Sequence, residues 1–202
     1  MLKWNPFKRP MPQLPKTLTA EEHLAPGAPF NPDNFAPWQG FRDLTPEVLA
    51  SIADEDLHRA VTNHVRLKEA DSFRAAKTIS RQDFTNEVFL LNAVWILEAE
   101  VRNGAFTQFF RNHDEQAVRD AADGLKMIGA EGSLHALREA IGVFSYLFPY
   151  LIGLVEEYSL ARPAEPPESE TATHDFHVHQ QELDACRVQF MRAMSAAQLA
   201  LG

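Results

Sequence analysis

The chain has 202 residues, which is enough for one domain with a substantial core, and its apolar share of 45 % is that of an ordinary globular protein. Its single cysteine, Cys186, excludes an internal disulfide and favours a reducing, cytoplasmic location. The net charge of −9 argues against direct nucleic acid binding, because an acidic body repels phosphate.

Residues 1–43 form a distinct N-terminal segment. They hold most of the 13 prolines, and proline removes a backbone donor and blocks helix interiors. The segment also carries aromatic residues such as Trp4 and Trp38, which argues against a purely solvated tail. We therefore predict an irregular, Pro-rich arm at 1–43, some of whose aromatics lie on a helical domain formed by residues 44–202.

The first helix of that domain is expected to start at Thr45-Pro46, since threonine caps helices and proline fits the first helical position. It should run to about Ala70, with a break near Asp54. A second helix is expected over about 83–103, ending at Asn103-Gly104. Its sequence is apolar nearly all round, so we predict that it is buried at the centre of the fold and that Trp95 belongs to the core.

Further helices follow in close succession. A short one is expected from Phe106 to Arg111, and another, capped by Asn112 or Asp114, should continue to Ile128 and end at Gly129. Ser133 is expected to open a helix that runs through Phe144, with more helix to about Leu160. The uncharged run 140–155 is too short to span a membrane and contains a proline, so we expect no membrane insertion.

Residues 163–175 are rich in proline and glutamate and predict a mobile surface loop. The last helix is expected from about Gln180 to Leu199, with the apolar stripe Leu183, Cys186, Phe190 and Met194. No segment has the period of a strand. The predicted fold is therefore all-α, a multi-helix bundle around the buried helix 83–103.

Residues 100–110 read Glu-Val-Arg-Asn-Gly-Ala-Phe-Thr-Gln-Phe-Phe. This resembles the signature of the DNA-mimic-protein-like domain family: an acidic residue, Asn-Gly-Gly-Phe, one residue, Gln and an aromatic pair. Residues 125–130 and 140–144 resemble two further family elements, so that the resemblance covers about 86–148. Ala105 departs from the pattern, because it stands where the family has its second glycine.

The resemblance implies an all-helical fold, and it supplies no catalytic residues to carry over to this chain. The family's named member is an acidic dimer that occupies the DNA-binding face of a transcriptional regulator. The resemblance therefore implies a protein partner, a basic DNA-binding protein, for this chain as well, and it leaves a homodimer open.

The signature has two interpretations. Glu100, Asn103 and Gln108 could form a polar binding site. Alternatively, Asn103-Gly104 caps a helix, Gln108 bonds free carbonyls at that helix end, and the aromatic residues fill the core. We favour the structural interpretation, which predicts that Phe106, Phe109 and Phe110 are buried.

The residues His174, His177 and His179 could bind zinc or nickel, but their position in a predicted loop without a nearby fourth ligand argues against it. Cys186 is expected to be a small core residue, and no catalytic, phosphate-binding or dinucleotide-binding motif is present. We therefore expect neither an enzyme nor a cofactor.

The acidic residues are the remaining candidates for a site. A phosphate-like array could be formed by Asp54, Glu55, Asp56, Asp114, Glu115, Asp120 and Asp123. Glu98–Arg102, Glu115–Arg119 and Arg119–Asp123 have the spacing for internal pairing, which would neutralise part of this surface. The sequence thus favours a non-enzymatic, acidic protein-binding module of the DNA-mimic kind. The alternatives are a metal-binding protein or enzyme that uses the 174–179 histidines, and a structural domain of an assembly.

Overall fold

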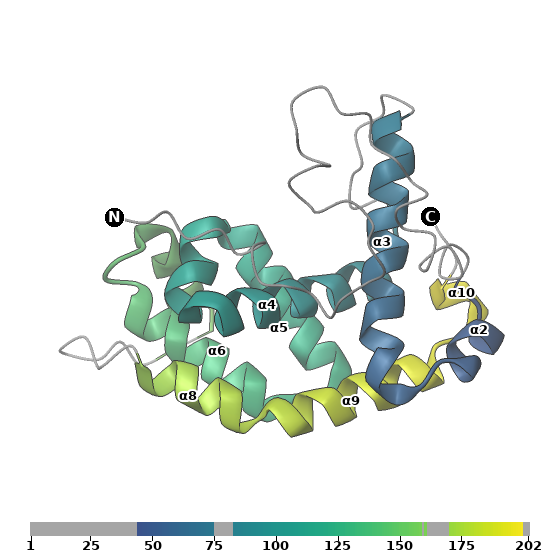
Figure 1. Ribbon diagram of the computed structural model, residues 1–202. Helices are drawn as coiled ribbons and strands as arrows, with labels where there is room; N and C mark the ends of the chain where they lie inside the picture. Colours follow the sequence, from purple (N-terminus) through teal and green to yellow (C-terminus); the bar gives the residue numbers. More distant parts are fainter. Residues whose placement is uncertain (1–43, 75–82, 159, 161–169, 200–202) are drawn as a thin grey trace, which may run out of the picture.

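The computed structural model describes residues 44–74, 83–158, 160 and 170–199, and these residues form helices connected by short turns, without a strand (Figure 1). The all-α fold is confirmed. The predictions for the N-terminal arm 1–43 lie outside the described residues.

The N-terminal helices follow the predicted start and break. Helix α2 (Pro46–Ser51) is capped by Thr45, whose Oγ1 accepts a hydrogen bond from the Val48 amide at 3.2 Å. A 3-10 turn, η3 (Asp54–Asp56), then leads into the long helix α3 (Leu57–Arg74). The interruption near Asp54 places the carboxylates of η3 beside the first turn of α3.

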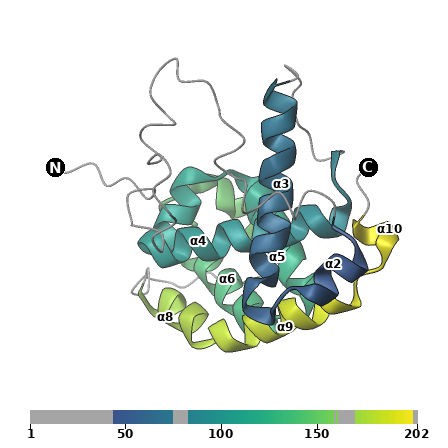
Figure 2. The same ribbon diagram turned by 45° about the vertical axis from the view of Figure 1, so that its right-hand side comes forward.

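Helix α4 (Asn86–Asn112) lies at the centre of the fold and contacts α3, α5, α8 and α10 (Figure 2). Its buried side is formed by Val88, Leu91, Val94, Leu97 and Val101, at the spacing of one helix face. The opposite side is only half-buried. The predicted central position of this helix is confirmed. Trp95 was predicted to belong to the core, but it is half-buried, at the edge of the buried side, four residues after Leu91.

A kink at Gly104-Ala105 divides α4, where the sequence predicted the end of one helix and the start of the next. Gly104 is extended (φ −163°), whereas Ala105 has φ 61° and ψ −177°. This positive-φ conformation is adopted almost only by glycine. The departure of Ala105 from the family pattern thus falls at a strained backbone position.

We expect the substitution Ala105→Gly to raise the free energy of unfolding by about 1 kcal/mol, because relief of the strain exceeds the entropy that glycine adds to the unfolded chain. Urea unfolding monitored by circular dichroism would measure this change. Ala99→Gly, in the regular part of α4, is the matched control and should instead destabilise by about 1 kcal/mol. Equal destabilisation by both substitutions would contradict the strain at Ala105.

The kink turns three aromatic residues of the signature into the core, as predicted. Phe106, Phe109 and Phe110 are fully buried, and their rings meet those of neighbouring helices. Phe106 packs edge-on against Phe176 with ring centroids 5.5 Å apart, and Phe110 lies 5.4 Å from Phe144. This cluster joins α4 to the helices on either side of it.

Helix α5 (Glu115–Ile128) begins at Asp114, whose Oδ1 accepts from the Ala117 amide at 3.0 Å, and ends at Gly129 with φ 77°. Both ends agree with the sequence, with Asp114 rather than Asn112 as the cap. Helix α5 approaches α4 closely at Gly124, where an added Cβ would lie 2.7 Å from the Leu90 carbonyl oxygen. Only a residue without a Cβ fits there unless the helices move apart.

Helix α6 (Glu131–Phe144) starts earlier than predicted. Ser133 is buried within the first turn and does not cap the helix; the cap position is Ala130. The Gly132 amide instead donates to Glu182 Oε1 at 3.3 Å, from a helix far along the chain. A short turn, η5 (Pro149–Leu151), and helix α7 (Ile152–Glu157) follow. None of the described helices combines the length and the apolar character required to cross a bilayer.

The C-terminal part also differs from the prediction. Residues 170–175 belong to helix α8 (Glu170–Val178) and not to a loop, because Ala172 and Phe176 are buried, and α8 packs against α6. The remainder of the predicted loop lies outside the described residues. The last helix is broken at Met194-Ser195 into α9 (Gln180–Ala193) and α10 (Ala196–Leu199).

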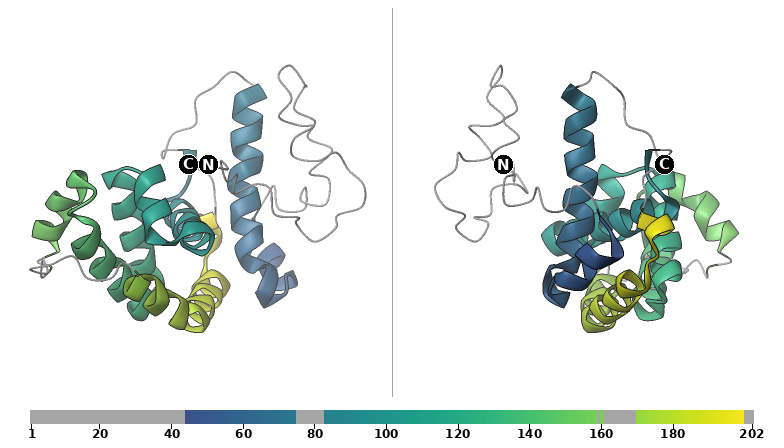
Figure 3. Two further views of the ribbon diagram at one scale, coloured as in Figure 1. Left: turned by 60° about the vertical axis from the view of Figure 1, so that its left-hand side comes forward. Right: turned by 90° about the vertical axis from the view of Figure 1, so that its right-hand side faces the viewer.

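Helix α9 runs along one side of the molecule and contacts α2 and α3 as well as α5 and α6 (Figures 1 and 3). Of its predicted stripe, Leu183 and Met194 are buried, whereas Cys186 and Phe190 are half-buried. The face that points inward also contains Arg187. Arg187 is thus a charged residue among the buried positions of this helix.

Candidate functional site

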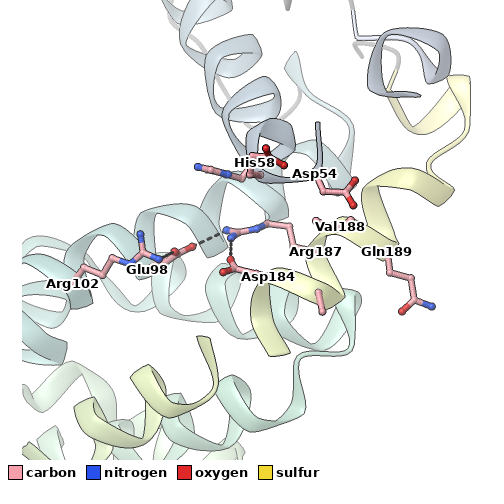
Figure 4. Close-up of a pocket in the computed structure, with 10 residues that line it drawn as sticks. Asp54, His58, Glu98, Arg102, Asp184, Arg187, Val188 and Gln189 are labelled. Atoms are coloured by element: carbon pink, nitrogen blue, oxygen red, sulfur yellow. Dashed lines mark hydrogen bonds and ion pairs between the residues drawn. The ribbon is translucent and has the colours of Figure 1, made fainter. Parts of the chain in front are cut away.

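A groove of about 680 Å³ lies between the start of α3, the middle of α4 and α9 (Figure 4). Its lining combines charged groups with a small apolar wall and consists of Asp54, Glu55, His58, Glu98, Arg102, Asp184, Ala185, Arg187, Val188 and Gln189. This volume is in the range of ordinary ligand pockets.

The inner end of the groove is a buried ion-pair network. The Arg187 guanidinium lies between Glu98 and Asp184 (Figure 4); Nη1 donates to Glu98 Oε2 at 2.7 Å, and Nη2 donates to Asp184 Oδ1. Glu98 is 4 % exposed and Arg187 is 5 % exposed. A second arginine, Arg102, reaches Glu98 Oε1 at 2.6 Å, which confirms the predicted pair four residues apart.

Gln180 extends this network, because its Nε2 donates to Glu98 Oε1 at 3.1 Å and to Asp184 Oδ1 at 3.2 Å. Removal of two charges from water is costly unless each charge is paired and hydrogen-bonded. Here each charged group has a partner, and the network joins α9 to α4.

The mouth of the groove is more acidic. Asp54 is paired with Arg192, whose Nη2 lies 2.5 Å from Asp54 Oδ1 and 2.6 Å from the Ile52 carbonyl oxygen. Arg192 therefore holds η3 against α9. Among the described residues, the carboxylate of Glu55 has neither a hydrogen bond nor an ion pair, and it is exposed.

The polar residues of the signature form a separate cluster at the kink of α4. Gln108 Nε2 donates to Glu100 Oε2 at 2.7 Å, Asn112 Nδ2 donates to the same oxygen at 2.9 Å, and His113 lies 3.6 Å from Glu100 Oε1. Gln108 was expected to bond free carbonyls; it bonds the carboxylate instead. Asn103 is half-buried and is not among the groups bonded to Glu100.

Gly104 is required by this cluster. A Cβ at that position would lie 2.2 Å from Gln108 Oε1, because the amide packs directly over the glycine. Glu100 thus bridges the two halves of α4 across the kink, with its hydrogen bonds directed within the protein.

The acidic residues of α5 have different surroundings. Asp114, Asp123 and Glu115 lie on the side that meets α7, where Arg119 bridges Glu115, at 2.5 Å, and Glu157. Asp120 is only 5 % exposed and accepts from Gln116 Nε2 at 3.1 Å. The structure therefore does not bring Asp120 to the surface with the other three.

Two tyrosines near these carboxylates, Tyr150 and Tyr158, have raised pKa values. Burial raises the pKa of Tyr150 to about 12, with a smaller contribution from Asp114. Burial also raises the pKa of Tyr158. The nearby carboxylates of Asp123 and Glu115 raise it further, whereas the guanidinium groups of Arg119 and Arg138 lower it. Both shifts are expected, because burial disfavours a charged phenolate and nearby negative charge adds to this effect.

The remaining candidates lie apart from these sites. Asp54 and Glu55 are exposed and Asp56 is half-buried, all in η3 at the groove and not beside α7. His174 and His177 are exposed on α8, whereas His179 is bonded through Nδ1 to Glu182 at 2.9 Å. Within the part of the chain that the structure describes, no three His, Cys, Asp or Glu side chains are grouped to hold a metal ion.

Sequence reasoning did not single out the groove. Its Arg187 stands between the apolar positions Leu183 and Met191, at spacings of four residues, and this spacing was the one available signal for a buried arginine. The assembly of η3, α4 and α9 around it depends on tertiary packing.

These features define an all-α protein in which most of the described polar side chains at the candidate sites bond to other side chains, and in which free carboxylates remain at the surface. The family model described as DMP19-like protein matches residues 82–199, which is more than half of the chain, and the chain belongs to this family. The match begins just before α4 and ends with α10, so that α2 and α3 lie outside it. No curated protein and no solved structure matches the chain.

Proposed function

We propose that this protein is a non-enzymatic, protein-binding module whose exposed carboxylates occupy the basic face of a DNA-binding protein. The observation that carries the proposal is membership of the DMP19-like family, a family of DNA mimics. The net charge of −9 is consistent with a basic partner.

The surface that we assign to this role, here called the α5–α7 surface, consists of Asp114, Glu115, Asp123 and Glu157. Glu115 and Asp123 stand eight residues apart on α5, about 12 Å along the helix axis, and Glu157 of α7 lies beside Glu115. Arg119 lies among them and bonds Glu115 and Glu157, so it orients these carboxylates while it offsets part of their charge. Asp120 has no part in this surface, because it is buried.

The test uses the full chain immobilised and exposed to the DNA-binding proteins of the native host, with bound proteins eluted by duplex DNA and identified by mass spectrometry. A mimic should release its partner to DNA. Its affinity should also fall steeply between about 50 mM and about 500 mM salt, because exposed charge is screened within about 8 Å at physiological ionic strength.

The double variant Glu115→Gln/Asp123→Asn should bind that partner about fivefold to tenfold more weakly, the effect of losing two exposed charge pairs. Asp114 is retained because it caps α5. The matched control is Glu131→Gln/Glu139→Gln on α6, which removes the same charge from exposed positions and should leave affinity unchanged. A partner that still holds its DNA in the complex, or that binds equally well at both salt concentrations, would end the proposal.

A further inference from the structure

The groove between η3, α4 and α9 is distinct from the α5–α7 surface, and it has a charge distribution of its own. Three of its four carboxylates are neutralised by arginines: Glu98 by Arg102 and Arg187, Asp184 by Arg187, and Asp54 by Arg192. Glu55 alone has no such partner among the described residues. Within the described part of the chain, the groove therefore has a neutral inner end and one free negative charge, that of Glu55, at its mouth.

The wall formed by α9 adds an apolar element. Ala185 and Val188 line the groove between the charged side chains of that helix. A ligand that satisfies both features has a cationic head and an aliphatic stem. Arginine and lysine side chains have this construction, since their methylene stems cover apolar surface while the head stays hydrated or paired.

The volume is also suitable. A groove of about 680 Å³ has room for one or two long side chains together with the backbone that presents them. Figure 4 shows the side chain of Gln189 extending away from the Arg187, Glu98 and Asp184 side chains, and Ala185, Asp184 and Gln189 on α9 are exposed. This shape favours a side chain presented by a protein.

We propose that the groove binds an arginine or lysine side chain of a partner protein, with Glu55 as the residue that pairs with its cationic head. The α9 wall then contacts the stem, and the Glu98–Arg187 pair stays intact as the inner end of the groove. One side of the groove comes from η3 and α3, which lie outside the family match, so this site is a feature of the chain and not of the matched segment. The proposal does not rest on the α5–α7 surface.

The test is a titration of the full, isotopically labelled protein with the blocked tripeptide acetyl-Gly-Arg-Gly-amide, followed by amide chemical shifts. The lysine peptide is run in parallel, and the citrulline peptide, of nearly the same shape without the charge, is the ligand control. We expect saturable, weak binding of the two charged peptides, with shift changes concentrated in η3, the start of α3 and residues 184–189, and none with citrulline.

Glu55→Gln should weaken the binding of the arginine peptide about fivefold, the factor that corresponds to about 1 kcal/mol for one exposed ion pair. Because Glu55 is exposed and has no ion-pair partner among the described residues, this variant should fold normally, which the unchanged amide spectrum of the other helices would verify. Glu156→Gln is the matched control: it removes one exposed carboxylate from α7, which lies at the other end of the molecule from α3 (Figure 3). It should leave the affinity as it is.

Equal binding of the citrulline peptide, shift changes outside the groove, or an affinity that Glu55→Gln does not alter would overturn the proposal. Agmatine, the free decarboxylated arginine, distinguishes the two sources of such a cation. If agmatine binds more than about tenfold more tightly than the peptide, the ligand is a free amine and the protein side chain is excluded.

Discussion

Glu98→Ala is expected to lower the free energy of unfolding by about 3–5 kcal/mol, the range for the removal of one partner from a buried ion pair. The substitution leaves Arg187 charged and almost fully buried, with only Asp184 to compensate it. It also leaves the side chain of Gln180 with one partner fewer. Arg102 loses less, because its side chain is 54 % exposed and can be hydrated.

Chemical unfolding of the single variants Glu98→Leu and Arg187→Leu and of the double variant measures the coupling between the two residues. The double variant should be less destabilised than the sum of the single ones, because it leaves no uncompensated charge. Glu139→Gln, which alters an exposed pair with His135, is the control and should change the free energy of unfolding by less than about 0.5 kcal/mol. A loss below about 1 kcal/mol for Glu98→Ala would contradict the buried network.

Phe109→Ala is expected to cost about 3–5 kcal/mol, as for other fully buried aromatic side chains. Phe109 is 0 % exposed, and its ring centroid lies 5.6 Å from that of Phe110 and 5.1 Å from that of His113. Truncation would open a cavity directly after the kink, where Ala105 already holds the backbone in an unfavourable conformation. Neighbouring side chains have little freedom to collapse into that space.

Thermal and urea unfolding would measure this loss. Leu147→Ala is the control, since Leu147 is 68 % exposed and its truncation should change the free energy of unfolding by less than about 0.5 kcal/mol. Similar effects of the two substitutions would show that Phe109 does not contribute to the core as its burial implies.

The sequence predicted those features that depend on local chemistry. Thr45 and Asp114 cap their helices through their own side chains, and Gly129 supplies the left-handed residue that ends α5. The kink after Asn103 was also predicted, because Asn-Gly interrupts an otherwise apolar run. Each of these signals acts within a few residues of the chain.

The errors arose where tertiary contacts decide the structure. Residues 170–175 look like a solvated loop by composition, yet Ala172 and Phe176, four residues apart, bury one face of a helix against its neighbours. Ser133 has the residue type of a helix cap, but the start of α6 is satisfied by Glu182 instead. Trp95 lies in an apolar run, but it stands at the edge of the buried side of α4 and is only half-buried.

The groove could not be predicted from the sequence, because it too depends on tertiary contacts. Its residues come from three segments that are distant in sequence, and the buried Arg187 occupies a position that a helical stripe assigns to an apolar residue. The i,i+4 rule found Glu98–Arg102 because both residues are on one helix. It gives no information on a pair such as Glu98–Arg187, which is 89 residues apart.

The bond between the Gly132 amide and Glu182 has a consequence for the order of events during synthesis. Gly132 emerges 50 residues before Glu182, so the first turn of α6 is made long before the carboxylate that completes it. Until α9 has been translated and has docked, the Gly132 amide lacks this partner and must be hydrated instead. Helical proteins usually assemble quickly through contacts between near neighbours in sequence. In this chain one amide of the first turn of α6 is satisfied only by a late, long-range contact, and a chain that ends before residue 182 would lack that bond.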